Sequence, residues 1–259
     1  MVAAANAKPN VKKAIFVQRI DSFARPEGAG KPPKPSPEPE EPQLYELMGR
    51  NIKWISPVDL KVTINPTGNL DAVDDVTVVS TITASANTWN IPLQDTDEGD
   101  LFGSYETDLV VGNGDSYEED AIRDGINRVF FADISLKHPS AIAVCIVYYI
   151  NVGPPSQRRI LEFDVVFDAE ITFIINGEET DFSWGNAGTT DENNLGNTLI
   201  MDLQNIATHE LGHALGLADL YDTTAPVPEQ TMYGYASPGE TKKRTLEDGD
   251  KAGITVLYG

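Results

Sequence analysis

The stretch H-E-L-G-H-A-L-G-L-A-D, residues 209–219, sets the frame for the rest of the chain. His209 and His213 are four residues apart, so on a helix their imidazoles leave the same face one turn apart and can bind one metal ion. Glu210 follows the first histidine and can reach a water molecule at that metal without being a ligand. The spacing therefore predicts a helix that carries a zinc site and a general base.

The residues around this motif have the pattern of an amphipathic helix. Its apolar stripe consists of Leu199, Leu203, Ile206, Ala207, Ala214 and Leu215. We expect the helix to begin near Asn197 or Thr198, because either residue is a suitable N-cap. We expect it to end at Gly216, which can adopt a left-handed backbone conformation at no steric cost and turn the chain back.

A catalytic zinc takes three protein ligands and leaves a fourth position to water. The chain has three histidines, and the third, His138, lies far upstream of the motif. Asp219 is the nearest strong donor that a turn at Gly216 would bring toward the metal. The predicted site is therefore Glu210 as the catalytic residue, with the metal ligands His209, His213 and Asp219.

Two other interpretations of the motif stay open. An acid late in the chain, Glu247 or Asp248, is an alternative third ligand, because the motif alone does not fix that position. The second alternative is an ordinary helix with two surface histidines, followed by a solvated Asp219. The combination of spacing, glutamate, glycine and aspartate argues against this second alternative.

The pattern H-E-x-x-H-x-x-G-x-x-D resembles the zinc-binding sequence of metzincin proteases, in the variant that has aspartate as the third ligand. The segment T-M-Y-G-Y at 231–235 resembles the metzincin methionine turn, with Met232 in the matching place. Residues 245–259 resemble the last helix of matrixin catalytic domains. Residues 74–89 and 159–168 resemble, more loosely, the first helix and an early strand of matrixin-like proteases.

The resemblance implies an α+β fold of the metzincin kind. Its elements would be a twisted, mostly parallel sheet, an active-site helix, a methionine turn and a C-terminal helix. It also implies a secreted, zinc-dependent endopeptidase that acts on protein or peptide substrates and binds one catalytic Zn²⁺. Some metzincins have a tyrosine two residues after the methionine, whereas this chain has Gly234, so neither Tyr233 nor Tyr235 is given a role.

Matrixins often bind structural Ca²⁺, and three clusters in this chain are rich in oxygen donors and glycine. They lie within residues 95–100, 113–120 and 186–194. Solvated acidic loops are the alternative interpretation of each cluster.

Hydrophobic patterns predict the other elements. Strands are expected at 60–65, 141–150, 160–167 and 171–175, and helices at 74–89 and 117–134. The single cysteine, Cys145, excludes an internal disulfide and is expected to be buried in the strand at 141–150.

The first 45 residues differ in composition from the remainder. Seven of the 17 prolines fall between Pro26 and Pro42, and the formal charge is +2 for residues 1–45 against −23 for residues 46–259. We therefore predict an N-terminal extension with a proline-rich spacer, followed by a catalytic domain at 46–259. The extension is either a disordered linker or an inhibitory prosegment, in which residues 13–20 form a short strand or a docking segment.

The net charge of −21 argues against binding to nucleic acid, whose phosphates attract cations. No apolar run reaches the roughly 18 residues of a membrane-spanning helix. Two alternatives to an active protease stay open: a latent zymogen, or a catalytically silent, zinc-containing binding protein.

Overall fold

The computed structural model describes most of the chain. The described residues are 11–20, 42–55, 59–69, 73–90, 100–108, 117, 123–175, 177–189 and 199–259. The proline-rich spacer lies almost wholly outside these ranges.

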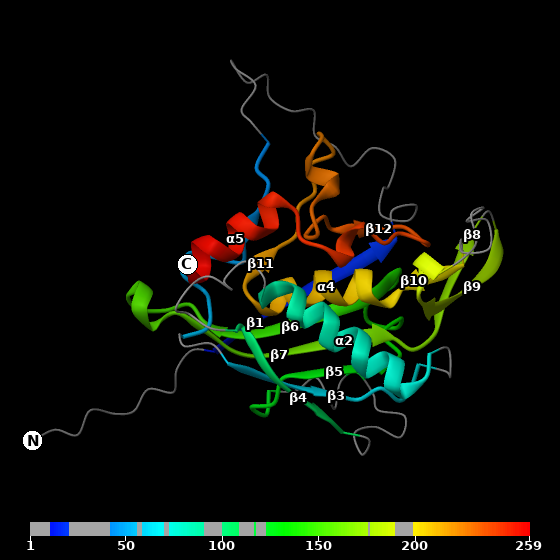
Figure 1. Cartoon of the computed structure of the whole chain (residues 1–259), viewed down its shortest axis with the longest axis horizontal. Coiled ribbons are helices and arrows are strands. Elements are labelled where there is room, and N and C mark those ends of the chain that lie inside the picture. Colours follow the sequence, from blue (N-terminus) through cyan, green and yellow to red (C-terminus); the bar gives the residue numbers. More distant parts are fainter. Residues whose placement is uncertain are drawn as a thin grey trace, which may run out of the picture.

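A seven-stranded sheet is the centre of the fold, and its strand order is β12-β1-β6-β7-β5-β3-β4 (Figure 1). The strands are β1 (Val11–Ile20), β3 (Leu60–Ile64), β4 (Phe102–Thr107), β5 (Arg128–Ala132), β6 (Ala141–Ile150), β7 (Arg159–Asp168) and β12 (Tyr235–Ala236). Strand β6 is antiparallel to both of its neighbours, and the other four strand pairs are parallel. The predicted α+β fold with a mostly parallel sheet is thus confirmed.

The remaining elements are three α-helices, two small sheets and four short 3-10 helices within the described residues. The helices are α2 (Asp75–Asn90), α4 (Leu203–Ala214) and α5 (Asp248–Tyr258). The small sheets contain β8 (Ile171–Ile175), β9 (Glu178–Gly185) and β10 (Ile200–Asp202), and β2 (Glu46–Leu47) and β11 (Leu217–Ala218). The 3-10 helices are η2 (Pro155–Gln157), η3 (Ala187–Thr189), η4 (Val227–Glu229) and η5 (Lys242–Arg244).

The predicted strands at 141–150 and 171–175 match β6 and β8, and those at 60–65 and 160–167 match β3 and β7 to within two residues. The helix predicted at 74–89 is α2. The short helix predicted within 117–134 is wrong for Arg128–Ala132, which forms strand β5 between β3 and β7, while residues 118–122 lie outside the described residues. The apolar run of β5 is buried on both faces of a parallel sheet. A short run of this kind has no alternation of apolar and polar residues, so the sequence pattern does not distinguish a strand from a helix.

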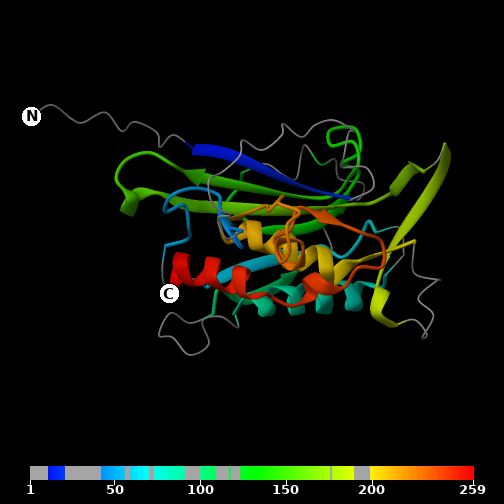
Figure 2. The same cartoon turned by 90° about the horizontal axis from the view of Figure 1, so that it is seen from above.

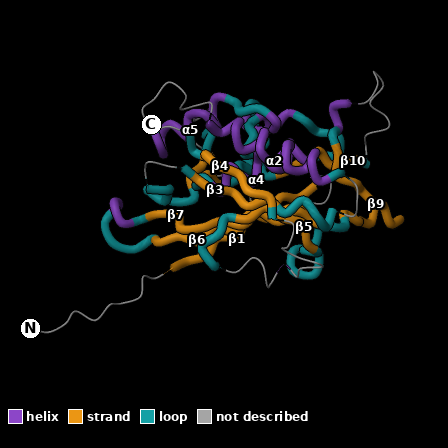
Figure 3. Tube along the Cα trace, turned by 60° about the horizontal axis from the view of Figure 1, so that its bottom comes forward, coloured by secondary structure: helices purple, strands orange, loops and turns teal. Residues whose placement is uncertain are grey.

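The helices α2 and α4 lie side by side on one face of the sheet (Figure 3). The larger hydrophobic core fills the space between them and the strands, and it includes Trp89, Phe163 and Leu211. A smaller core on the opposite face includes Phe130 and Val166. Cys145 is fully buried in β6, as expected. None of the helices in the described ranges is long and apolar enough to cross a membrane.

Strand β1 lies inside the sheet, between β6 and β12, although it belongs to the predicted N-terminal extension. It is antiparallel to β6 along most of its length and parallel to β12 at Arg19 and Ile20. Figure 2 shows β1 running along β6, with α4 on the inner side of the sheet. The expected short strand at 13–20 is therefore present, while the division of the chain at residue 45 stays a prediction.

Strand β7 carries three buried acidic side chains, Glu162, Asp164 and Asp168, at alternating positions on the face away from α4. Backbone N–H groups of Asp124 and Gly125 donate to Glu162, and those of Ile134 and Glu170 lie 3.5 Å from Asp168. Burial, with the nearby Glu162 charge adding to it, raises the pKa of Asp164 to about 8. Asp164 is therefore largely protonated at neutral pH.

We expect Asp164→Asn to increase the free energy of unfolding at pH 8 by about 1 kcal/mol or more. An acid with a raised pKa in the folded state stabilises the fold at low pH, and this contribution is lost as the pH rises from about 4 to about 8. The amide cannot ionise, so urea unfolding of the variant should show a smaller decline between pH 5 and pH 8. The exposed Glu178→Gln is the control, and an equal decline in all three proteins would contradict this account of Asp164.

Candidate metal centre

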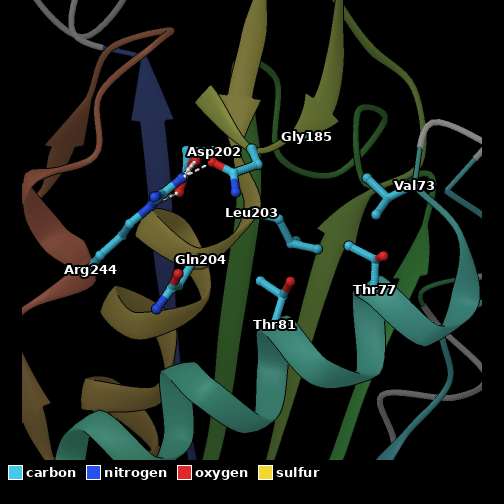
Figure 4. A pocket seen from close by; sticks show the side chains of 9 residues that line it. Val73, Thr77, Thr81, Gly185, Asp202, Leu203, Gln204 and Arg244 are labelled. Atoms are coloured by element: carbon cyan, nitrogen blue, oxygen red, sulfur yellow. Dashed lines mark hydrogen bonds and ion pairs between the residues drawn. The ribbon is translucent and has the colours of Figure 1, made fainter. Parts of the chain in front are cut away.

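Helix α4 begins at Leu203 because Asp202 caps it. The Asp202 side chain accepts hydrogen bonds from the backbone N–H groups of Asn205 and Ala187, both at 2.8 Å. Arg244 donates to both Asp202 oxygens, as Figure 4 shows. The predicted start at Asn197 or Thr198 is wrong, because Ile200–Asp202 is strand β10 and pairs with β9 before the helix begins.

A small cavity of about 50 Å³ lies between α2 and the start of α4, lined by Thr77, Thr81 and Arg244 among others (Figure 4). None of the predicted metal ligands lines this cavity. It belongs to the packing that holds the first turn of α4.

The turn after α4 places Asp219 against the helix it has just left. Gly216 has a φ of +102°, and a side chain there would also meet the carbonyl oxygen of Ile52. This is the left-handed turn that the sequence predicted. After it, Leu217–Ala218 pairs with β2, and the backbone N–H of Leu220 donates to Met232.

The two motif histidines are held in the tautomer that a metal ligand needs. The Nδ1–H of His209 donates to the carbonyl of Thr231 at 2.8 Å, and the Nδ1–H of His213 donates to the carbonyl of Leu217 at 3.0 Å. A carbonyl only accepts, so each Nδ1 carries the proton and each Nε2 has a free lone pair.

The free lone pairs converge with a carboxylate oxygen on one point. The Nε2 atoms of His209 and His213 are 3.1 Å apart. Asp219 Oδ1 lies 3.2 Å from the Nε2 atom of His209 and 3.4 Å from the Nε2 atom of His213. Within the described part of the chain, these three residues are the group whose donor atoms are close enough to share an ion. The structure thus brings together the three residues that the sequence selected as ligands.

Protons compete with a cation for this group. Burial lowers the pKa of His209 to about 3, so its ring is neutral. Burial also acts to lower the pKa of His213, but the adjacent Asp219 carboxylate outweighs this effect and raises it. Metal binding would therefore weaken as the pH falls.

Glu210 lies on α4 beside the first ligand and is completely buried. Neither of its carboxylate oxygens has a hydrogen-bond partner among the described residues. Burial raises its pKa to about 8 in the metal-free protein, and the Asp219 charge adds to this.

The other predicted candidates lie away from the three ligands. His138 is near the hydroxyl of Tyr117, at 2.9 Å. Glu247 caps helix α5, and the Asp248 side chain is 97% exposed. Neither acid belongs to the group of converging donor atoms. Of the three clusters that suggested Ca²⁺, the structure describes only residues 100, 117 and 186–189, so these predictions lie mostly outside the described residues.

The segment with Met232 forms a buried turn beneath the site. Asp250 of α5 accepts hydrogen bonds from the backbone N–H groups of Thr231 and Met232, at 2.8 and 3.1 Å. Gly212 of α4 packs so closely on Met232 and Trp89 that a side chain there would overlap with both. Helix α5 therefore fixes the turn, and the turn supports α4 and, through the carbonyl of Thr231, His209.

Two residues near the site were not identified from the sequence. Tyr221 donates its hydroxyl to Asp219 Oδ2 at 3.0 Å, and its ring occupies the space over Gly234. Lys243 is fully buried and donates to the carbonyls of Tyr233 and Tyr235, on either side of that glycine. The close spacing of Tyr221 to Asp219 is a signal that could have identified the tyrosine, whereas Lys243 has none.

Strand β1 covers the centre from the side of the sheet edge. The ring of Phe16 stacks on His213, with centroids 4.0 Å apart and planes 8° from parallel. The three ligand side chains are consequently buried, with exposed fractions of 0%, 0% and 7%. The sequence predicted that residues 13–20 are a short strand or a docking segment. It did not identify Phe16 as the residue that contacts the site.

Comparison with known families gives an independent result. The Peptidase_M10 family model, described as Matrixin, matches residues 154–259, which include α4, the turn with Met232 and α5. The resemblance to matrixins is thus confirmed for this part of the chain. Among curated proteins, none matches the chain.

We expect Tyr221→Phe to weaken zinc binding about 10- to 100-fold, as loss of a hydrogen bond to a ligand typically does. The phenyl ring keeps the packing on Gly234 and removes only the donor to Asp219. Competition with a chromogenic chelator measures the affinity. Tyr235→Phe, which alters the ring that contacts Tyr221, is the control. Equal affinities in the two variants would show that the hydroxyl does not act on the metal site.

Proposed function

We propose that this chain is a zinc-dependent endopeptidase, with His209, His213 and Asp219 as the metal ligands and Glu210 as the general base. The observation that supports the ligand set is the convergence of three buried atoms, each of which can offer a lone pair to a cation. Two neutral imidazoles and a carboxylate are the kind of three-ligand set that a catalytic zinc site uses.

Zinc, when bound, supplies a Lewis acid and lowers the pKa of its water to about 7. Glu210 is placed next to the first ligand, has free carboxylate oxygens and is shielded from solvent. It takes the proton from the attacking water and delivers it to the leaving amine. The helix fixes its position, because α4 is capped at Asp202 and held by the turn at Met232.

We expect Glu210→Gln to reduce cleavage of casein at least about 10²- to 10⁴-fold while about one zinc per chain is retained. The amide cannot accept the proton, but it leaves the ligands unchanged. Activity and zinc content are measured on the same samples, after the segment that contains β1 has been released by the cleavage described below.

Two further variants make this experiment decisive. The exposed Glu229→Gln is the matched control and should cleave casein like the wild type. His213→Ala should lose the metal. A wild type that holds zinc but cleaves no peptide bond would favour the alternative, a catalytically silent zinc-containing binding protein.

The proposal includes latency. Strand β1 fills the edge of the sheet beside the metal centre, and the hydrogen-bonding positions on β6 and β12 that an extended peptide would use are taken by residues 11–20. We infer that residues 1–45 are an inhibitory prosegment and residues 46–259 the catalytic domain. Secretion belongs to the same proposal, since metzincins are mostly secreted.

We expect a full chain with a specific protease site inserted between Pro26 and Pro42 to be nearly inactive on casein until that site is cut. Cutting frees β1 to dissociate, since only noncovalent contacts then hold it in the sheet. The rate of casein cleavage before and after cutting is the measurement, and the uninserted chain treated with the same protease is the control. Full activity of the uncut chain would contradict the inhibitory role.

A further inference from the structure

The side of β1 that faces α4 carries one buried polar residue. Alternate residues of a strand point to the same face, and on this face Phe16 lies against His213 while Ile20 belongs to the main core. Gln18 stands between them and has an exposed fraction of 0%. A fully buried glutamine in the strand that covers a metal centre needs a partner for its carboxamide.

The carboxamide oxygen of Gln18 has no such partner in the described protein. Its nitrogen lies 3.5 Å from the carbonyl of Arg19, whereas its Oε1 is unsatisfied. The other unsatisfied acceptors near α4 are both oxygens of Glu210 and Oδ1 of Asp219. All of these oxygen atoms carry lone pairs, and none of them has a hydrogen-bond partner among the described residues. A cation satisfies such a group of acceptors.

We propose that Gln18 is the residue through which the N-terminal strand closes the metal centre, its carboxamide oxygen being the fourth ligand in the latent protein. This inference rests on the proposed zinc site and on the proposed latency. The ligand would stand in the position that the attacking water needs. Latency would then result from direct occupation of the metal as well as from the strand that fills the sheet edge.

The local structure of β1 favours this role for Gln18. Its pairing with β6 shifts register between Gln18 and Arg19, where Ile142 of β6 is skipped, and Arg19 and Ile20 also pair with β12. The strand is thus held on both sides of Gln18, by β6 before it and by β12 after it.

The chemistry of an amide suits a removable ligand. A thiolate is a strong zinc ligand, but the chain has no cysteine outside β6. A carboxamide oxygen is neutral and binds through a lone pair without loss of a proton. It can therefore leave once the strand is released, with no proton transfer and no redox step.

The test measures access to the metal in the uncut chain. The protein is loaded with Co²⁺ in place of zinc and titrated with acetohydroxamate, and binding is followed in the visible spectrum of the metal. Gln18→Leu keeps most of the side-chain volume and removes the oxygen. If the amide closes the metal in about nine-tenths of the molecules, the variant should bind acetohydroxamate about tenfold more tightly than the wild type.

Two further variants complete the test. Gln18→Glu offers a charged oxygen at the same place and should bind acetohydroxamate more weakly than the wild type. Ile15→Ala, on the other face of the same strand and partly exposed, is the control and should behave like the wild type. Thermal unfolding confirms that each variant is folded. Because Leu and Glu act in opposite directions, a general loosening of β1 cannot produce both results.

The outcomes separate this inference from the proposed function. If the Leu and Glu variants bind acetohydroxamate as the wild type does, while all bind one Co²⁺ per chain and cleave casein after cutting, the role of Gln18 is wrong and the protease assignment stands. If no protein binds the metal, the proposed function itself fails.

Discussion

The buried convergence of two imidazole nitrogens and one carboxylate oxygen is the constraint on which the rest of the structure depends. Three lone-pair donors within 3.1 to 3.4 Å of one another are unfavourable without a cation or a proton between them. The surrounding structure holds them there. Carbonyls of Thr231 and Leu217 fix both rings, and Tyr221 holds the carboxylate.

Support for this group comes from both ends of α4. Asp202 and Arg244 fix its first turn, and Gly216 turns the chain after its last. Behind the helix, Asp250 holds the turn that supplies the Thr231 carbonyl. Side chains that bind a metal must be held in place by the residues around them, because a small displacement of a ligand or a base strongly reduces the rate of catalysis.

The N-terminal strand is the part of the fold on which the proposed latency rests. It completes the sheet between β6 and β12, buries the centre and stacks Phe16 on a ligand ring. An edge strand that exposes its hydrogen-bonding groups invites pairing with an extended chain. Here residues 11–20 of the chain itself pair with that edge, which is the basis for the proposed latency and for the role given to Gln18.

The sequence by itself determined which three side chains converge, because H-E-x-x-H fixes two of them on one helical face and a single glycine turn brings Asp219 back to them. It also determined most strands and α2, whose hydrophobic patterns are local. Only the tertiary structure decided that Arg128–Ala132 is a strand, since a short buried run fits either element. The same holds for the burial of Gln18 and Lys243, which are distant from the motif in sequence and are positioned by sheet pairing and packing.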